Sequence, residues 1–146
     1  MMISRRMLTR KNQQGVSLIE LMIVVLIIAL LAMISYPSYR EFAAKAKRNE
    51  AKAALLMAAT NQERFYLQNN QFSVDLTELG FAASPFTTDT GSYVITVAAP
   101  VPAANFTVTA TYQLGGSEAG KCNVFTIDGR GDKTSTPDTD CWVRTR

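Results

Sequence analysis

Three residues near the start of the chain have types and spacing that could do chemistry together. Gly15 and Val16 stand between a basic stretch and a long apolar run, and Glu20 is the one charged residue from Val16 to Tyr36. A carboxylate inside an apolar segment costs roughly a few kcal/mol, so we expect it to have a partner. If the chain is cut after Gly15, the new α-amine of Val16 is mostly protonated at neutral pH, because such amines have a pKa of about 8.

The new amine and Glu20 would lie four residues apart, a spacing that puts them on one face of a helix. Two opposite charges about 4 Å apart attract by about 4 kcal/mol at an effective dielectric constant of 20, which offsets much of the burial cost. The spacing leaves open whether the amine comes from the same chain or from a neighbour. The four-residue spacing favours an ion pair with a function over an ordinary membrane anchor that contains an acid by coincidence.

The run Gly15 to Glu20, with its basic leader and the apolar segment behind it, resembles the class III signal of type IV pilins and related pseudopilins. The resemblance implies that a prepilin peptidase cuts after Gly15 on the cytoplasmic side and N-methylates Val16. It also implies that Glu20 guides assembly into a filament, through the amine of a neighbouring subunit. Val16 is a departure, since the family usually has phenylalanine there. The implied partners are other pilin subunits, the peptidase and an inner-membrane assembly platform.

Length and charge limit the classes of protein that remain. The 146 residues leave room for one compact domain beside the apolar run. The formal charge of +3 suggests an acidic partner, but four of the 15 basic side chains and none of the 12 acidic ones lie in residues 1–15. Without this leader the side chains carry a net charge of −1. The excess of positive charge therefore belongs to a segment that is expected to be removed.

The apolar run is long enough to cross a membrane. As a helix, its 21 residues span about 31 Å, close to the thickness of the hydrocarbon core of a bilayer. A secretory signal has its small-residue cut site after the apolar core, whereas Gly15 precedes it, so the run should stay in the mature chain. Basic residues are balanced on its two sides and leave the orientation undecided.

The two cysteines decide the orientation. Cys122 and Cys141 both lie in the C-terminal region, and an even pair favours a disulfide in an oxidising compartment over two buried thiols in a cytosolic domain. We therefore expect a single-pass precursor in the inner membrane, with a cytoplasmic N-terminus and a periplasmic C-terminal domain, and later a cell-surface pilus. The closed loop of about 20 residues would stabilise the fold by roughly 3 kcal/mol.

Helix-forming residues continue beyond the apolar run to about residue 68. Pro37 should kink this helix rather than end it, because it removes one backbone donor and crowds the preceding turn. One face is expected to pack on the rest of the chain, and it consists of Tyr39, Phe42, Ala46, Ala53, Leu56 and Thr60. A basic cluster is expected on a solvated face, with partner contacts as the alternative: Lys45, Lys47, Arg48 and Lys52.

Alternating apolar and polar residues predict strands over 93–97, 106–112 and 122–127. The first two should be joined by a reversal at Pro100–Pro102, and Asp128-Gly129 predicts a hairpin into a fourth strand near Lys133. Residues 71–90 are expected to connect helix and sheet, with a short helix around 75–79 that Gly80 stops.

This order predicts an α+β protein with the type IV pilin fold, in which a long N-terminal helix, apolar in its first half, packs on a small antiparallel sheet with a C-terminal disulfide-bounded loop. We divide the chain into a cleaved leader (1–15), a transmembrane and filament-core helix (16–36), an amphipathic continuation (37–68) and a globular head (69–146). The tail from Cys122 to Thr134, with Cys141-Trp142, is similar to PilE/ComP-type minor pilins.

Catalysis finds little support in these residues. The chain has no histidine and its cysteines are expected to be bonded, so the commonest base and the thiol nucleophile are missing. We expect no enzyme, no cofactor and no metal. Four aspartates could gather around Ca²⁺, but their spacing does not match a calcium loop and favours turn and surface roles: Asp128, Asp132, Asp138 and Asp140.

Direct DNA binding is the alternative from a different class. Five basic side chains could contact phosphates: Lys121, Arg130, Lys133, Arg144 and Arg146. Five acidic residues interleave with them, so a basic patch forms only if the fold separates the charges. The sequence therefore favours a structural subunit, a minor pilin, that supports pilus biogenesis and functions such as surface motility, adhesion or DNA uptake. The alternatives are a DNA-uptake receptor pilin and a type II secretion pseudopilin.

Overall fold

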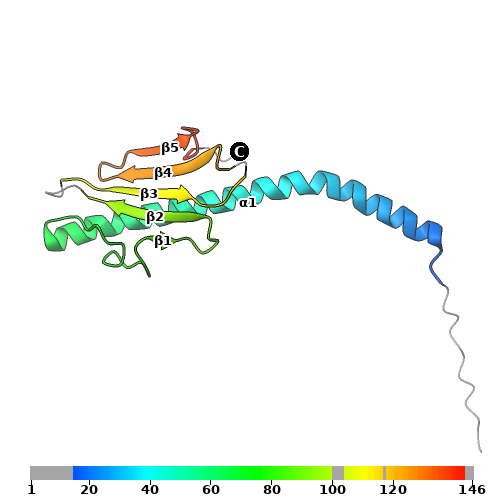
Figure 1. Ribbon diagram of the computed structural model, residues 1–146, viewed down its shortest axis with the longest axis horizontal. Helices are drawn as coiled ribbons and strands as arrows, with labels where there is room; N and C mark the ends of the chain where they lie inside the picture. The colour runs from blue at the N-terminus through cyan, green and yellow to red at the C-terminus, as the bar shows by residue number, and fades with distance from the viewer. Residues whose placement is uncertain (1–14, 100–103, 117, 144–146) are drawn as a thin grey trace, which may run out of the picture. The chain divides into compact units, whose positions relative to one another are not determined.

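The computed structural model describes residues 15–99, 104–116 and 118–143. Contacts divide the chain into two compact units, Met1–Tyr39 and Arg40–Arg146. We call the second unit the head. One helix and five strands follow each other along the chain (Figure 1): α1 (Leu18–Asn69), β1 (Phe86–Thr87), β2 (Tyr93–Ala98), β3 (Thr107–Tyr112), β4 (Cys122–Asp128) and β5 (Lys133–Pro137).

The helix α1 has 52 residues and ends one residue beyond the predicted position. Its first hydrogen bond runs from the N–H of Leu21 to the carbonyl of Ser17, 3.2 Å away. Asn70 follows the last turn with a φ of 54°, the left-handed conformation in which helices commonly end. Pro37 lies inside the helix. The prediction that Pro37 does not end the helix is thus confirmed, and a kink there stays a prediction.

The five strands form one antiparallel sheet in the order β1-β2-β3-β4-β5. Tyr93 pairs with Tyr112 across β2 and β3, and Thr109 pairs with Thr126 across β3 and β4. The predicted hairpin is present, because β4 and β5 pair through Ile127 and Lys133. The reversal predicted at Pro100–Pro102 falls outside the described residues.

Residues 71–90 differ from the prediction in two places. The short helix expected around 75–79 is a turn, in which Leu76 accepts hydrogen bonds from Leu79 and Phe81. Gly80, with a φ of 84°, ends this turn as it would have ended the helix. The second difference is β1, which pairs with β2 through Phe86 and Ile95. Two residues are too few to show an alternating pattern, so the sequence carried no signal for this strand.

The face of α1 that packs on the sheet is not the predicted one. The predicted face is exposed, with Tyr39 at 72% and Phe42 at 71% of their full accessible area. The buried helix positions step by three and four residues along another face: Arg48, Ala51, Leu55, Ala58 and Gln62. Two of these five residues, Arg48 and Gln62, are polar, so the available partners outweighed hydrophobicity.

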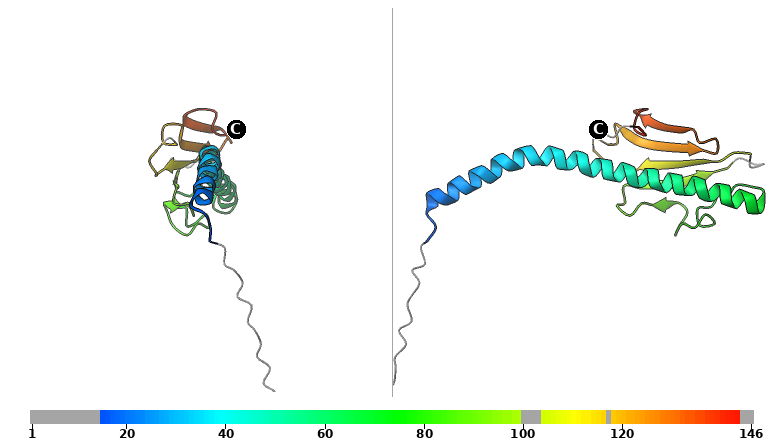
Figure 2. Two further views of the ribbon diagram at one scale, coloured as in Figure 1. Left: turned by 90° about the vertical axis from the view of Figure 1, so that its right-hand side faces the viewer. Right: turned by 180° about the vertical axis from the view of Figure 1, so that it is seen from behind.

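The core of the head lies between this helix face and the inner side of the sheet. It includes Leu55 from α1, Tyr93 and Ile95 from β2, and Phe125 from β4, all of them fully buried. In Figure 1 the sheet lies in front of the helix, and in the reverse view of Figure 2 the helix lies in front of the sheet. All buried hydrophobic side chains of the described residues belong to Arg40–Arg146, so the head has a core of its own.

Two buried or half-buried amides on α1 hold the connecting segment. Gln62 is fully buried, and its side-chain amide donates to the carbonyl of Ser73 (2.6 Å) and accepts from the N–H of the same residue (2.9 Å). Asn61 donates to the carbonyl of Leu79 (2.8 Å). The segment after the helix is therefore fixed to the helix through its backbone.

Candidate functional site

The three N-terminal residues singled out by the sequence lie at the start of α1. Gly15 and Val16 precede the helix, and among the described residues no atom beyond the chain neighbours lies within 4 Å of the position that a side chain on Gly15 would take. Val16 is 64% exposed. Glu20 lies in the first helical turn and is exposed, where the positive end of the helix dipole favours an acid. All three residues, Gly15, Val16 and Glu20, are thus exposed in the described part of the chain.

The helix that follows Glu20 presents apolar side chains on every side. All residues from Val16 to Arg40 are exposed. Within the described residues, α1 is the one helix with a stretch apolar and long enough to cross a membrane, and none of that stretch is buried. An apolar surface of this size needs lipid or other protein around it.

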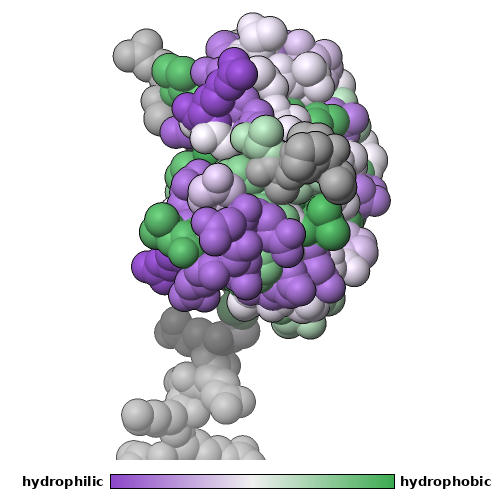
Figure 3. Space-filling view, turned by 90° about the vertical axis from the view of Figure 1, so that its left-hand side faces the viewer, coloured by the Kyte–Doolittle hydropathy of each residue, from purple (hydrophilic) through white to green (hydrophobic). Residues whose placement is uncertain are grey.

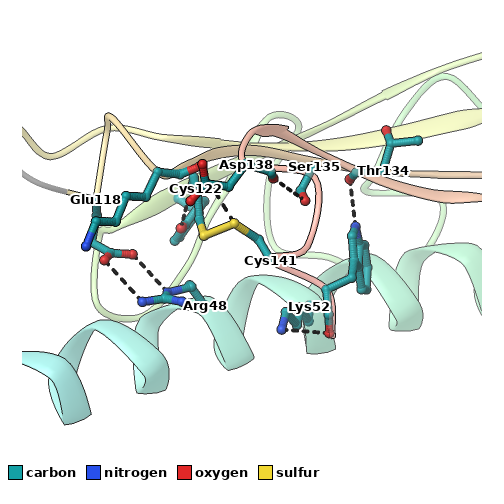
Figure 4. The surroundings of a disulfide bond; sticks show 11 residues. Arg48, Lys52, Glu118, Cys122, Thr134, Ser135, Asp138 and Cys141 are labelled. Atoms are coloured by element: carbon teal, nitrogen blue, oxygen red, sulfur yellow. Dashed lines mark hydrogen bonds and ion pairs between the residues drawn. A yellow bond between two sulfur atoms is a disulfide. The ribbon is translucent and has the colours of Figure 1, made fainter. Parts of the chain in front are cut away.

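In the head, the disulfide predicted from the sequence is formed. The sulfur atoms of Cys122 and Cys141 are 1.99 Å apart, their Cα atoms are 5.9 Å apart, and both residues are fully buried. The bond joins the start of β4 to the segment after β5 (Figure 4). Tyr93 donates from its hydroxyl to the carbonyl of Cys122 (2.9 Å), and burial raises the pKa of this hydroxyl.

An ion pair that sequence reasoning missed lies beside the disulfide (Figure 4). Arg48 on α1 and Glu118 in the β3–β4 loop meet at 2.9 Å and 3.2 Å, and their side chains are only 10% and 13% exposed. The expectation that Arg48 is solvated was therefore wrong. Seventy residues separate the two partners, and no local pattern marks either of them, so the pairing is visible only in the folded chain.

Lys52, another residue of the cluster predicted to be solvated, is also partly buried and hydrogen-bonded. Its ammonium donates to the carbonyl of Trp142 (3.1 Å). Partial burial, with a smaller contribution from nearby Arg48, lowers the pKa of Lys52. The indole of Trp142 donates to the carbonyl of Thr134 (2.6 Å) and packs edge-on against Phe125. The segment after Cys141 is thus held by contacts as well as by the disulfide.

The basic residues proposed for DNA contact do not gather at one place. Lys121 precedes β4 and Arg130 follows it, so the seven residues of the strand separate them by roughly 20 Å or more. Lys133 lies at the same end of the sheet as Arg130, and its ammonium lies over the ring of Trp142. Arg144 and Arg146 fall outside the described residues.

The acidic residues stay close to these cations. Asp128 and Asp132 flank Arg130 in the β4–β5 turn, while Asp138 donates from its N–H to the carbonyl of Lys121. The end of the head that carries this turn and the end of α1 is mostly hydrophilic, with hydrophobic groups scattered over it (Figure 3). Among the described residues, the three basic side chains considered for DNA contact, Lys121, Arg130 and Lys133, are thus interleaved with acidic ones.

The four aspartates considered for calcium lie in two places, at the β4–β5 turn and after β5. Asp138 and Asp140 come close to Cys141, but that sulfur is bonded to Cys122 and is not a free ligand. Asp128 has a turn role, because its carboxylate accepts the N–H groups of Arg130 (3.0 Å) and Asp132 (2.8 Å).

Comparisons with known proteins agree with this architecture. Among solved structures, a type IV pilin from Shewanella oneidensis matches 68% of this chain and 97% of its own, with a TM-score of 0.50 and 21% sequence identity. That likeness shows the fold, a type IV pilin fold. A family model described as "Type IV minor pilin ComP, DNA uptake sequence receptor" matches residues 37–126, and a prokaryotic N-terminal methylation motif matches residues 10–36.

The chain therefore belongs to the type IV pilin family and is of the ComP type. A curated relative, the type IV major pilin protein PilA of Myxococcus xanthus (strain DK1622), is 38% identical over 69 residues. That match covers 47% of this chain and only 31% of the relative. Type IV pilins are in general structural and not enzymatic proteins.

Proposed function

We propose that this chain is a minor pilin, a structural subunit of a type IV pilus. The precursor spans the inner membrane with its N-terminus in the cytoplasm and its head in the periplasm. Prepilin peptidase cuts after Gly15 and methylates Val16, and the assembly platform then moves the subunit into the filament. The observation that carries the proposal is the helix that begins with an exposed acid, Glu20, and has no buried residue up to Arg40.

During assembly, the first half of α1 would exchange one apolar environment for another. In the membrane the first half of α1 is surrounded by lipid, and in a filament it is surrounded by the same half of other subunits. Glu20 would be costly in either place without a partner, and the amine of a neighbouring Val16 supplies one. The pair favours one register of packing over its neighbours, because a shifted helix would leave the acid unpaired.

A substitution at Glu20 tests this role. We expect Glu20→Ala to lower the amount of the protein in sheared pili at least several-fold, because the ion pair that orients the incoming subunit is lost. Glu63→Ala removes an exposed acid from the same helix within the head and should leave incorporation unchanged. Both variants are compared with the wild type by immunoblot of pili and of membranes. Wild-type incorporation of Glu20→Ala would contradict the proposal.

Cleavage after Gly15 and methylation of Val16 can be measured directly by mass spectrometry. The intact mass of the protein from sheared pili should correspond to a chain that starts at Val16 and carries one added methyl group. A mass that retains residues 1–15, or a first residue other than methylated Val16, would refute the assignment. Counting this protein against the main subunit in the same pili would decide its abundance.

Direct DNA binding is a second candidate, and the description of the matching family as a DNA uptake sequence receptor favours it. The exposed residues Arg130 and Lys133 lie at one end of the sheet and Lys121 at the other. If the β4–β5 turn contacts DNA, Arg130→Gln should weaken binding by the head and reduce its salt dependence by about one phosphate contact. Lys121→Gln is the matched control at the opposite end.

A salt titration with the unmodified head decides the candidate. Binding that contacts phosphates weakens steeply as the salt concentration rises. Absence of any affinity at low ionic strength would end the DNA proposal and leave the structural one intact. Deleting the gene, and scoring surface pili, surface motility, adhesion and transformation together, would show which function depends on the subunit.

A further inference from the structure

We propose that the buried ion pair between Arg48 and Glu118 is a latch that keeps thiols away from the disulfide of the head. The latch holds the turn Glu118–Cys122 to α1, next to the sulfur atoms. A thiol reaches these atoms only after the turn has moved away from the helix. The turn therefore decides whether the disulfide can be reduced while the rest of the head stays folded.

The backbone of the turn connects Glu118 directly to the first cysteine. The carbonyl of Glu118 accepts the N–H groups of Lys121 (3.0 Å) and Cys122 (2.9 Å). Cys122 is also the first residue of β4. The position of Glu118 and the covering of Cys122 are thus coupled, because Glu118 cannot move far without breaking the hydrogen bond to the cysteine.

The side chain of Glu118 joins the turn to the helix. Its two carboxylate oxygens meet the guanidinium of Arg48 at 2.9 Å and 3.2 Å, a two-pronged arrangement that combines charge attraction with a fixed geometry. Figure 4 shows this latch in the surroundings of the disulfide, with Arg48 on α1. The ion pair therefore fixes the turn at the side where α1 passes the two cysteines.

Burial prevents any reaction of the disulfide in the closed state. A thiolate reduces a disulfide by attacking one sulfur, which forms a mixed disulfide and releases the other sulfur as a thiolate; a second thiol then completes the reduction. This attack needs access to a sulfur atom, and Cys122 and Cys141 both have 0% exposure. Some part of the head must therefore open before a thiol can react.

The chain just before the turn offers little resistance to opening. Four successive residues there are exposed: Gln113, Leu114, Gly115 and Gly116. Gly116 has a φ of 105°, which a residue with a side chain rarely adopts. Segments with few buried contacts open locally at a lower cost than the core. The described residues before Glu118 thus do not fix the turn by burial.

The chain after the turn is held more firmly by hydrogen bonds to its backbone. The carbonyl of Cys122 accepts the hydroxyl of Tyr93, and the carbonyl of Lys121 accepts the N–H of Asp138, each at 2.9 Å. These bonds hold the start of β4 to its neighbours. Opening should therefore begin on the helix side, where the latch is the contact that must break.

Electrostatics makes this opening costly while both partners are present. Arg48 is only 8% exposed, and its guanidinium stays charged at any ordinary pH. If Glu118 moved away, this buried charge would lose its partner and would remain near a second cation, Lys52, whose pKa Arg48 already helps to lower. A buried charge without a partner is strongly unfavourable. The closed turn is thus the state that the charges favour.

The test measures how fast the disulfide is reduced in the oxidised head, Arg40–Arg146, which has a core of its own. Dithiothreitol is added in excess, and free thiols are alkylated and counted by mass spectrometry at increasing times. Glu118→Gln keeps the shape of the side chain but removes its charge. We expect this variant to be reduced about tenfold or more faster than the wild type, because the turn opens locally.

Gln62→Ala is the matched control for a general loss of stability. Gln62 is fully buried and bonds to Ser73, and it lies 14 residues beyond Arg48 on α1, about 21 Å along the helix. Its replacement weakens the head without touching the turn. Reduction of this variant and of the wild type should need global unfolding, so the logarithm of the rate should rise steeply with urea.

Reduction of Glu118→Gln should instead depend little on urea at low concentrations, because a local opening exposes little surface. Arg48→Gln removes the other partner and should open the same route, and it replaces Glu118→Gln if that variant fails to fold. Wild-type rates of reduction in both variants would overturn the proposal. A dependence on urea as steep as that of Gln62→Ala would also overturn it, since the ion pair would then act only through global stability.

Rapid reduction of the wild type that does not depend on urea would contradict the latch as well, because the sulfur atoms would then be accessible with the ion pair intact. The latch lies wholly within the head. It does not depend on cleavage at Gly15 or on assembly through Glu20, so its failure would leave the proposed function untouched.

Discussion

Asp128 shows at the scale of one residue how a candidate ligand can serve a turn. Its carboxylate accepts two backbone N–H groups and so fixes the path from β4 into β5. Desolvation alone would raise the pKa of Asp128, but the hydrogen bonds from Asp132 and Arg130 outweigh it and hold the pKa below its ordinary value. The charged form is thus the one that the folded head prefers.

This preference predicts a pH dependence. Because the folded-state pKa is depressed, the stabilisation is fully present above the ordinary pKa of about 4 and is lost as the pH falls through the lower folded-state value. Asp128→Ala should lower the Tm of the head at pH 6, and its difference from the wild type should shrink towards pH 3. Asp89→Ala, which removes another exposed carboxylate, is the control. A difference that stays constant with pH would contradict the argument.

At the scale of elements, the buried ion pair Arg48–Glu118 joins α1 to the loop between β3 and β4. Its side chains are nearly removed from water, so the pair does more for the position of the loop than for net stability. Without either partner, the other charge would be left buried and unpaired. This asymmetry makes the pair testable by a double-mutant cycle.

We expect Glu118→Ala to lower the free energy of unfolding of the head by about 3 kcal/mol, because Arg48 is left without its partner. Arg48→Ala supplies the other single variant, and the double variant Arg48→Ala/Glu118→Ala should recover most of the loss, since no charge then remains buried and unpaired. Urea unfolding followed by circular dichroism measures both effects. Costs that simply add in the cycle would show that the two residues do not act as a pair.

At the scale of the whole molecule, one covalent link in the head joins the start of β4 to the segment after β5. Cys122 and Cys141 close a loop whose ends are 19 residues apart in sequence. Contacts of Lys52 and Trp142 hold the same region without the disulfide. The disulfide should therefore add stability to a fold that other contacts also specify.

Replacing both cysteines by serine should lower the free energy of unfolding by about 3 kcal/mol, the chain-entropy estimate for a loop of this length. Trp142 is the only tryptophan, so its fluorescence follows the region directly during urea unfolding. Reduced wild-type protein is the control, because it loses the link but keeps the cysteine side chains. Equal stability of the oxidised and reduced heads would contradict the prediction.

Much of this fold could be predicted from local pattern. The alternation of residues in 93–97 and 106–112 predicted β2 and β3 within one or two residues, and the pair Asp128-Gly129 predicted the β4–β5 hairpin. The cysteine count predicted the disulfide. These features could be predicted because each depends on residues that are neighbours in sequence, or on a pair with no alternative partner.

The buried face of α1 could not be predicted in this way. Pattern reasoning selected Tyr39, Phe42 and Leu56 for their hydrophobicity, but the fold buries Ala51, Leu55 and Ala58. Arg48 and Gln62 share that buried face because Glu118 and Ser73 supply their partners, 70 and 11 residues away. Whether a polar residue can be buried depends on whether a distant part of the chain supplies a hydrogen-bonding or charged partner for it.

By itself, then, the sequence determined an apolar helix with one acid at its start, the strands, and a disulfide, since charge, periodicity and cysteine number are all local or countable properties. Only the tertiary structure decided which helix face is buried and that Arg48 is paired and not solvated. Those outcomes depend on register and on contacts between distant segments, and neither is written in the spacing of neighbouring residues.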